Sequence, residues 1–123
     1  MNKKILVVED EELQRLALAK GLLKAGFNVI EATDGSEGLT IAFREHPDLI
    51  LTDLHMPKMD GSQMIHSLRE DEWGKIVPII ILTNYEIEDN QLGQIAVDYP
   101  SYYLMKVGNS LDNIIEKIAE LTK

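Results

Sequence analysis

Residues 3–12 read KKILVVEDEE, a short apolar run followed at once by four acidic residues. The apolar part is rich in branched side chains, which favour β-strands. Adjacent carboxylates repel one another, so the acidic part needs a counter-charge or a bound cation. The stretch therefore predicts a buried strand whose carboxyl end opens onto an acidic site, at the point where the chain passes into a helix.

The same strand-like pattern recurs along the chain, with amphipathic stretches in between. The further apolar runs cover residues 27–30, 49–51, 77–82 and 102–105. The middle runs lack polar alternation, as in strands that are covered on both faces. Strict alternation of strands and helices predicts an α/β fold, with residues 1–123 forming one domain around a doubly wound parallel sheet of five strands and five helices.

Apolar spacing also predicts which side of each helix faces the sheet. The first helix carries a stripe that we expect to be buried, made of Leu13, Leu16, Ala17 and Leu23. The last helix, residues 111–121, has the clearest helical period. The stretch around residues 86–97 has only a thin apolar stripe that Gly93 interrupts, so we expect the fourth helix to be the least stable.

Composition narrows the class of protein. A net charge of −9 argues against non-specific binding to nucleic acid or to anionic membranes, because both need clustered Lys and Arg. The absence of Cys excludes disulfides, thiol chemistry and Cys-ligated zinc. No apolar run approaches the roughly 18 residues of a membrane span. We therefore expect a cytoplasmic protein with no membrane segment.

Polar residues follow the predicted strands at the sheet edge where open α/β sheets bind ligands. They are Glu9, Asp10 and Glu11 after the first strand, Asp53 after the third, Thr83 after the fourth and Lys106 after the fifth. Several carboxylates with one lysine favour a hard divalent cation, and Mg²⁺ prefers such oxygen ligands. A cation, a lysine and a hydroxyl around one carboxylate are typical of phosphoryl transfer, in which the carboxylate can itself become an acyl phosphate.

Simpler roles stay open for some of these residues. Asp10 also fits a helix N-cap, while Glu11 and Glu12 fit the positive end of a helix. Asp53 is harder to explain in this way, because a carboxylate at the end of a strand covered on both faces is costly unless it is paired.

Four segments resemble the response-regulator receiver domains of two-component signalling. In chain order they are ILVVEDEE (5–12), PDLILTDLHMPKMDG (47–61), IIILTN (79–84) and YYLMK (102–106). The resemblance covers essentially the whole chain and implies the flavodoxin-like strand order 2-1-3-4-5. It also implies a protein that accepts a phosphoryl group from a sensor histidine kinase or a histidine phosphotransfer protein. Such a protein catalyses only its own phosphorylation and dephosphorylation.

The resemblance assigns the acidic residues to a phosphoacceptor and a Mg²⁺ site. Asp53 would take the phosphoryl group. Asp10, Asp53 and the backbone carbonyl of His55 would ligate Mg²⁺, and Glu9 would act through water. Glu9 stands where the family more often has Asp, and the His55 side chain would add a titrating charge beside the site.

The resemblance also implies a switch. Thr83 would hydrogen-bond the phosphoryl group, Lys106 would pair with it, and Tyr103 would be the aromatic residue that turns inward on activation. The surface that changes would comprise the helix 86–97, the strand 102–105 and the last helix, and it would bind a downstream protein. We hypothesise a monomer that can dimerise through this surface on phosphorylation, with no nucleic-acid contact by this domain.

Two departures from the family pattern lie near this switch. Asn84 follows Thr83 where a small residue is usual. Val107 follows Lys106 where the family has a proline, often after a cis bond. A cis bond before Val costs about 2.5–4 kcal/mol, so the segment either carries that strain or runs trans.

Three other functions remain as alternatives. A flavodoxin-like flavin protein would share the fold, but the acidic run would repel the FMN phosphate. A haloacid-dehalogenase-type phosphatase also uses an Asp nucleophile with Mg²⁺, yet its pattern has a second Asp where His55 stands. A degenerate receiver that only binds proteins is disfavoured, since Asp10, Asp53, Thr83 and Lys106 are all present.

Overall fold

The computed structural model describes residues 2–54, 56, 58–83, 101–105 and 110–123, and for residues 83 and 101–105 it describes the backbone alone. Strands and helices alternate as predicted from the first strand through the fourth, and a helix follows the last strand. The elements are β1 (Lys4–Val8), α1 (Glu12–Lys24), β2 (Asn28–Ala32), α2 (Gly35–Glu45), β3 (Leu49–Thr52), α3 (Gly61–Arg69), β4 (Ile79–Thr83), β5 (Ser101–Met105) and α5 (Leu111–Leu121). The predicted fourth helix lies outside the described residues.

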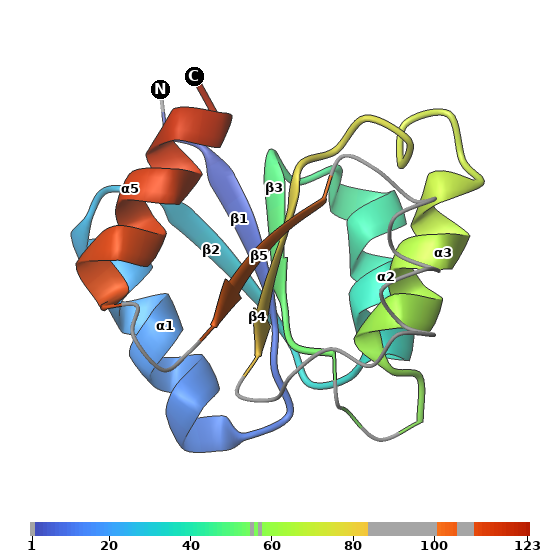
Figure 1. Ribbon diagram of the computed structural model, residues 1–123, viewed down its shortest axis with the longest axis horizontal. Helices are drawn as coiled ribbons and strands as arrows, with labels where there is room; N and C mark the ends of the chain where they lie inside the picture. The colour runs from blue at the N-terminus through green and yellow to red at the C-terminus, as the bar shows by residue number, and fades with distance from the viewer. Residues whose placement is uncertain (1, 55, 57, 84–100, 106–109) are drawn as a thin grey trace.

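The sheet is parallel throughout and has the strand order β2-β1-β3-β4-β5, as the resemblance implied. Figure 1 shows it between two helical layers, with α1 and α5 on one face and α2 and α3 on the other. The order reverses between β1 and β3, which are neighbours although β2 lies between them in sequence. The carboxyl ends of these two strands therefore border the crevice in which such sheets bind ligands.

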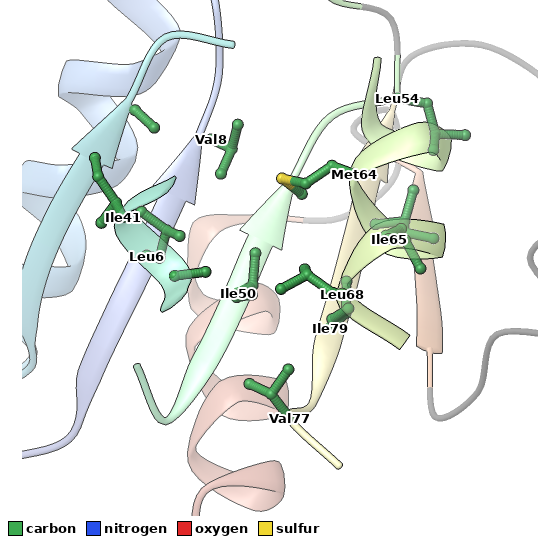
Figure 2. Packing of buried hydrophobic residues seen from close by; sticks show 13 residues of the cluster. Leu6, Val8, Ile41, Ile50, Leu54, Met64, Ile65, Leu68, Val77 and Ile79 are labelled. Atoms are coloured by element: carbon green, nitrogen blue, oxygen red, sulfur yellow. The ribbon is translucent and has the colours of Figure 1, made fainter. Parts of the chain in front are cut away.

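Side chains of the central strands alternate between two apolar cores. Leu6 and Ile50 belong to the core beneath α2 and α3, where they lie near Met64 and Leu68 (Figure 2). The intervening residues, such as Ile5, belong to the core beneath α1 and α5. Both faces are thus apolar, which explains the missing polar alternation. Each fully buried aliphatic side chain of this kind contributes about 1.5–3 kcal/mol.

Two strands differ from the prediction by more than one residue at one end. β2 continues through Glu31 and Ala32, which pair with the end of β1. A polar residue is tolerated there because β2 is an edge strand and Glu31 reaches solvent. β4 starts after Pro78, which lacks an N–H for a ladder bond, although the Pro78 carbonyl still accepts a bond of 3.0 Å from Ile50 N–H.

The predicted buried face of α1 is wrong. Leu13 is 83% exposed and Leu23 57% exposed, whereas Ala19 and Leu22 are the buried residues of this helix. Apolar side chains occur on both sides of α1, so their spacing does not select one side. The choice is made by packing against the sheet and α5, where a Cβ on Gly21 would meet the side chain of Leu111.

Within the described ranges, no helix combines the length and the apolar character needed to cross a membrane.

Candidate functional site

The ends of β1 and β3 bring three carboxylates together. Val8 pairs with Thr52, so Glu9 and Asp10 leave one strand beside the point where Asp53 leaves the other. The Asp53 N–H donates to the Val8 carbonyl at 3.2 Å. One carboxylate oxygen from each of Glu9, Asp10 and Asp53 lies within 4.8 Å of the other two. Residues 43 positions apart in sequence thus form one acidic cluster, as the sequence predicted.

Burial makes this cluster costly unless positive charge balances it. Glu9 is 2% exposed and Asp53 9% exposed, while Asp10 lies at the exposed rim. Like charges at such short range in a partly dry environment repel strongly. The donor set, three carboxylate oxygens with one open side, fits a hard divalent cation such as Mg²⁺. Oxygen ligands of one Mg²⁺ lie about 3–4 Å apart, so small rotations or a bridging water would complete the fit.

Local hydrogen bonds hold Asp53 at the edge of the sheet. Its Oδ1 accepts the Leu54 N–H at 2.7 Å, which orients the carboxylate. The buried Thr52 hydroxyl donates to the Asp53 carbonyl at 2.9 Å. A hydrogen bond also closes the loop that follows Asp53: the Gly61 N–H, at the start of α3, donates to the Leu54 carbonyl at 2.9 Å. Asp53 is therefore fixed from both sides along the chain.

The acidic residues that follow Asp10 have other roles. The N-cap of α1 is Glu11, with no side-chain capping bond, so the alternative role of Asp10 as the N-cap is not what the structure shows. The Glu11 carboxylate accepts from Gln14 Nε2 at 2.7 Å and is not part of the three-oxygen cluster. Glu12 lies exposed in the first helical turn, where negative charge favours the helix dipole.

One basic residue beside the cluster was missed in the sequence. Lys106 was the one base that the sequence placed at this edge of the sheet, but Arg15 on α1 also reaches the acidic segment, donating from Nη1 to the Glu9 carbonyl at 3.1 Å. The signal in the sequence was that Arg15 follows the acidic run by one helical turn. It was missed because the predicted buried face of α1 placed Arg15 on the side away from the sheet.

The other predicted site residues lie at or beyond the limit of what is described. Thr83 ends β4 and pairs with Met105, and Tyr103 lies within β5 opposite Ile81; their side chains are not described. His55, Lys106 and the bond to Val107 fall outside the described residues. Their roles stay predictions.

Residues 5–119 match the family model of the response regulator receiver domain. The chain belongs to that family. Receiver domains are signalling modules of two-component systems, and the acidic cluster of this receiver domain lies where the resemblance had placed the phosphoacceptor site.

Curated relatives agree with this assignment. The receiver domain is 45% identical over 94 residues to PhoP of Bacillus subtilis, an alkaline phosphatase synthesis transcriptional regulatory protein, covering 76% of this chain and 38% of PhoP. It is 34% identical over 92 residues to DivK of Brucella ovis, a polar-differentiation response regulator, covering 74% of each. The chain thus spans only about a third of the length of transcriptional regulators such as PhoP.

Solved structures share the receiver fold along nearly all of the chain. The chemotaxis protein CheY4 of Vibrio cholerae superposes with a TM-score of 0.87 at 25% identity, over 98% of this chain and 99% of that chain. The receiver domain of the sensor histidine kinase PA1611 of Pseudomonas aeruginosa gives a TM-score of 0.87 at 25% identity, over 99% of this chain and 98% of the other. That structure has a magnesium ion coordinated in its active-site cleft.

Gly61 allows the backbone of the receiver domain to close tightly behind Asp53. A Cβ at this position would collide with the Asp53 carbonyl oxygen and lie 2.9 Å from Leu54 Cα. Because these are backbone atoms, the loop must shift, and we expect Gly61→Ala to cost about 1–3 kcal/mol of unfolding free energy. Because the shift also moves Asp53, it should slow any phosphoryl transfer to that residue. Denaturant unfolding and intact-mass time courses measure the two effects.

Gly21→Ala is the matched control for Gly61→Ala. Its new Cβ would meet the flexible end of the Leu111 side chain rather than backbone, so the change should be nearly neutral for both readouts. Equal losses in the two variants would show that the contact behind Asp53 has no special role.

Lys58 lies in the loop between Asp53 and α3 and carries local backbone strain. Its φ is 65°, in the left-handed region, and its Nζ lies 3.7 Å from Asp34 Oδ2. Glycine relieves such strain, worth roughly 1–2 kcal/mol. The ion pair contributes little, because its N–O distance is long and the Lys58 side chain is 76% exposed. We expect Lys58→Gly to raise the free energy of unfolding by about 0.5–1 kcal/mol once the greater freedom of unfolded glycine is subtracted. Lys75 does not have a positive φ, so Lys75→Gly should lower the free energy of unfolding. A lower free energy of unfolding in both variants would show that the backbone at Lys58 is not strained.

Proposed function

We propose that this receiver domain accepts a phosphoryl group on Asp53 from a phosphohistidine on a sensor histidine kinase or a histidine phosphotransfer protein. The observation that carries the proposal is the convergence of Glu9, Asp10 and Asp53 at the β1–β3 crevice, with Asp53 oriented by the Leu54 amide. Asp53 is buried, and hydrogen bonds of its own side chain and backbone fix it. Its carboxylate is therefore held in one orientation in which it can react repeatedly.

The reaction that this geometry supports is an in-line displacement. An oxygen of the Asp53 carboxylate attacks phosphorus, the bond from phosphorus to the donor nitrogen breaks, and the imidazole leaves with its electron pair as an acyl phosphate forms. Mg²⁺ bound at the acidic cluster would offset the charge of the phosphoryl oxygens. Asp10, Asp53 and the His55 carbonyl would ligate it, with Glu9 acting through water. We propose that Thr83 and Lys106 contact the phosphoryl oxygens.

The phosphorylated state would be read through a surface of the domain. We propose that Tyr103 and the Thr83 end of β4 transmit the change to the face formed by β5, α5 and the segment 86–97 between β4 and β5. As a mechanism this is a population shift, in which phosphorylation favours one of two packings. A downstream protein or effector domain would bind that face, and a second copy of the chain is the other candidate occupant.

Incubation with acetyl phosphate and Mg²⁺, followed by intact-mass measurement, tests the proposal. We expect the mass of one phosphoryl group to be added when both reagents are present, and little or none after chelation of Mg²⁺. Incorporation that does not depend on Mg²⁺ would contradict the role of the acidic cluster. No incorporation under any condition would favour a receiver that acts only by binding proteins.

A further inference from the structure

The peptide that joins Glu9 to Asp10 is held on both sides. The Glu9 N–H donates to the Ala32 carbonyl at 3.0 Å, which ties the end of β1 to the end of β2. The Glu9 carbonyl accepts from Arg15 Nη1 at 3.1 Å. This peptide carries two of the three carboxylates of the cluster, so its orientation sets where both side chains start.

Arg15 is itself fixed in place. Its Nε lies 3.2 Å from Glu31 Oε1 on β2, and its side chain is only 13% exposed. Its backbone N–H donates to the Glu11 carbonyl at 2.9 Å in the first turn of α1. A planar guanidinium can donate in two directions at once with little loss of freedom, which an ammonium group does less well. One side chain thus ties α1, β2 and the acidic loop together.

We propose that Arg15 is a positioning residue for the cation site: it holds the Glu9–Asp10 peptide so that both carboxylates face the cation that Asp53 shares. This inference rests on the proposed function of that site. Arg15 donates to a backbone carbonyl, so its effect reaches the cation through the ligands' orientation. Groups that orient metal ligands in this way typically affect metal affinity about 10–100-fold.

A different role, simple charge compensation, predicts the opposite pattern. A positive charge beside the cluster repels a cation, so removing that charge alone would tighten Mg²⁺ binding. Arg15→Lys separates the two roles, because it keeps the charge and loses the planar fork that spans Glu9 and Glu31. Arg15→Gln removes the charge as well.

The test is a titration with MgCl₂ alone, without a phosphoryl donor, followed by amide chemical shifts of residues 9–11 and 53–54. We expect Arg15→Lys to weaken Mg²⁺ binding about tenfold, and Arg15→Gln to bind no more tightly than the unchanged protein. Arg44→Lys is the matched control; Arg44 lies on α2 with 64% of its side chain exposed and should leave the affinity unchanged. Thermal unfolding in EDTA shows whether each variant is fully folded, since a purely structural role would lower the melting temperature without changing the affinity.

An unchanged affinity in Arg15→Lys, or tighter binding in Arg15→Gln, would overturn the inference and leave the phosphoacceptor proposal standing. Absence of Mg²⁺ binding in the unchanged protein would overturn both the cation site and the role of Arg15. Phosphoryl incorporation at Asp53 is measured separately, so the two failures are distinguishable.

Discussion

Asp53→Asn is expected to abolish the phosphoryl incorporation that we propose for the unchanged protein in acetyl phosphate and Mg²⁺. The amide nitrogen and oxygen carry no negative charge, so the side chain no longer attacks phosphorus at a useful rate. The amide keeps the shape of the carboxylate, and its oxygen can still accept the Leu54 N–H that orients Asp53 at 2.7 Å. The variant should therefore lose incorporation while it stays folded. Intact mass measures the incorporation, and circular dichroism measures the folding.

Asp112→Asn provides the matched control for this experiment. Asp112 lies exposed in the first turn of α5, so the same chemical change there should leave incorporation intact. Equal incorporation in Asp53→Asn and in the unchanged protein would move the phosphoacceptor to another residue and would remove the basis of the proposed function.

Leu22→Ala is expected to destabilise the protein by about 2–5 kcal/mol. Leu22 is 0% exposed and belongs to the core beneath α1 and α5, together with Ile5 and Ile114. Truncation removes apolar contacts and leaves a cavity that neighbours on the sheet and on α5 fill only in part. Urea denaturation measures the loss in the free energy of unfolding, provided that the variant and the unchanged protein have the same m-value.

Leu13→Ala is the matched variant on the same helix. Leu13 is 83% exposed, so the change should stay within about 0.5 kcal/mol. Together the two variants test which side of α1 faces the sheet. A large loss in Leu13→Ala with a small one in Leu22→Ala would restore the buried face that apolar spacing had predicted.

Much of the site was predictable because parallel strands end at one edge. Once the runs that include Ile5 and Ile50 are recognised as strands, the residues that follow them must meet there. Asp53 could be singled out from sequence because burying a carboxylate at the end of an apolar strand costs free energy unless it is paired. The exposed rim position of Asp10 and the engagement of Glu11 by Gln14 could not be predicted, since they depend on where α1 starts.

By itself, the sequence determined the alternation of strands and helices, the parallel sheet and the acidic edge, because these follow from local runs of apolar and charged residues. Only the tertiary structure decided which of two apolar sides of α1 is buried and which base reaches the acidic loop. Burying Leu22 instead of Leu13 also turns Arg15 toward Glu9 and Glu31. Both outcomes depend on one rotation of the helix about its axis, which is set by contacts with the sheet and α5 and not by any residue of α1 alone.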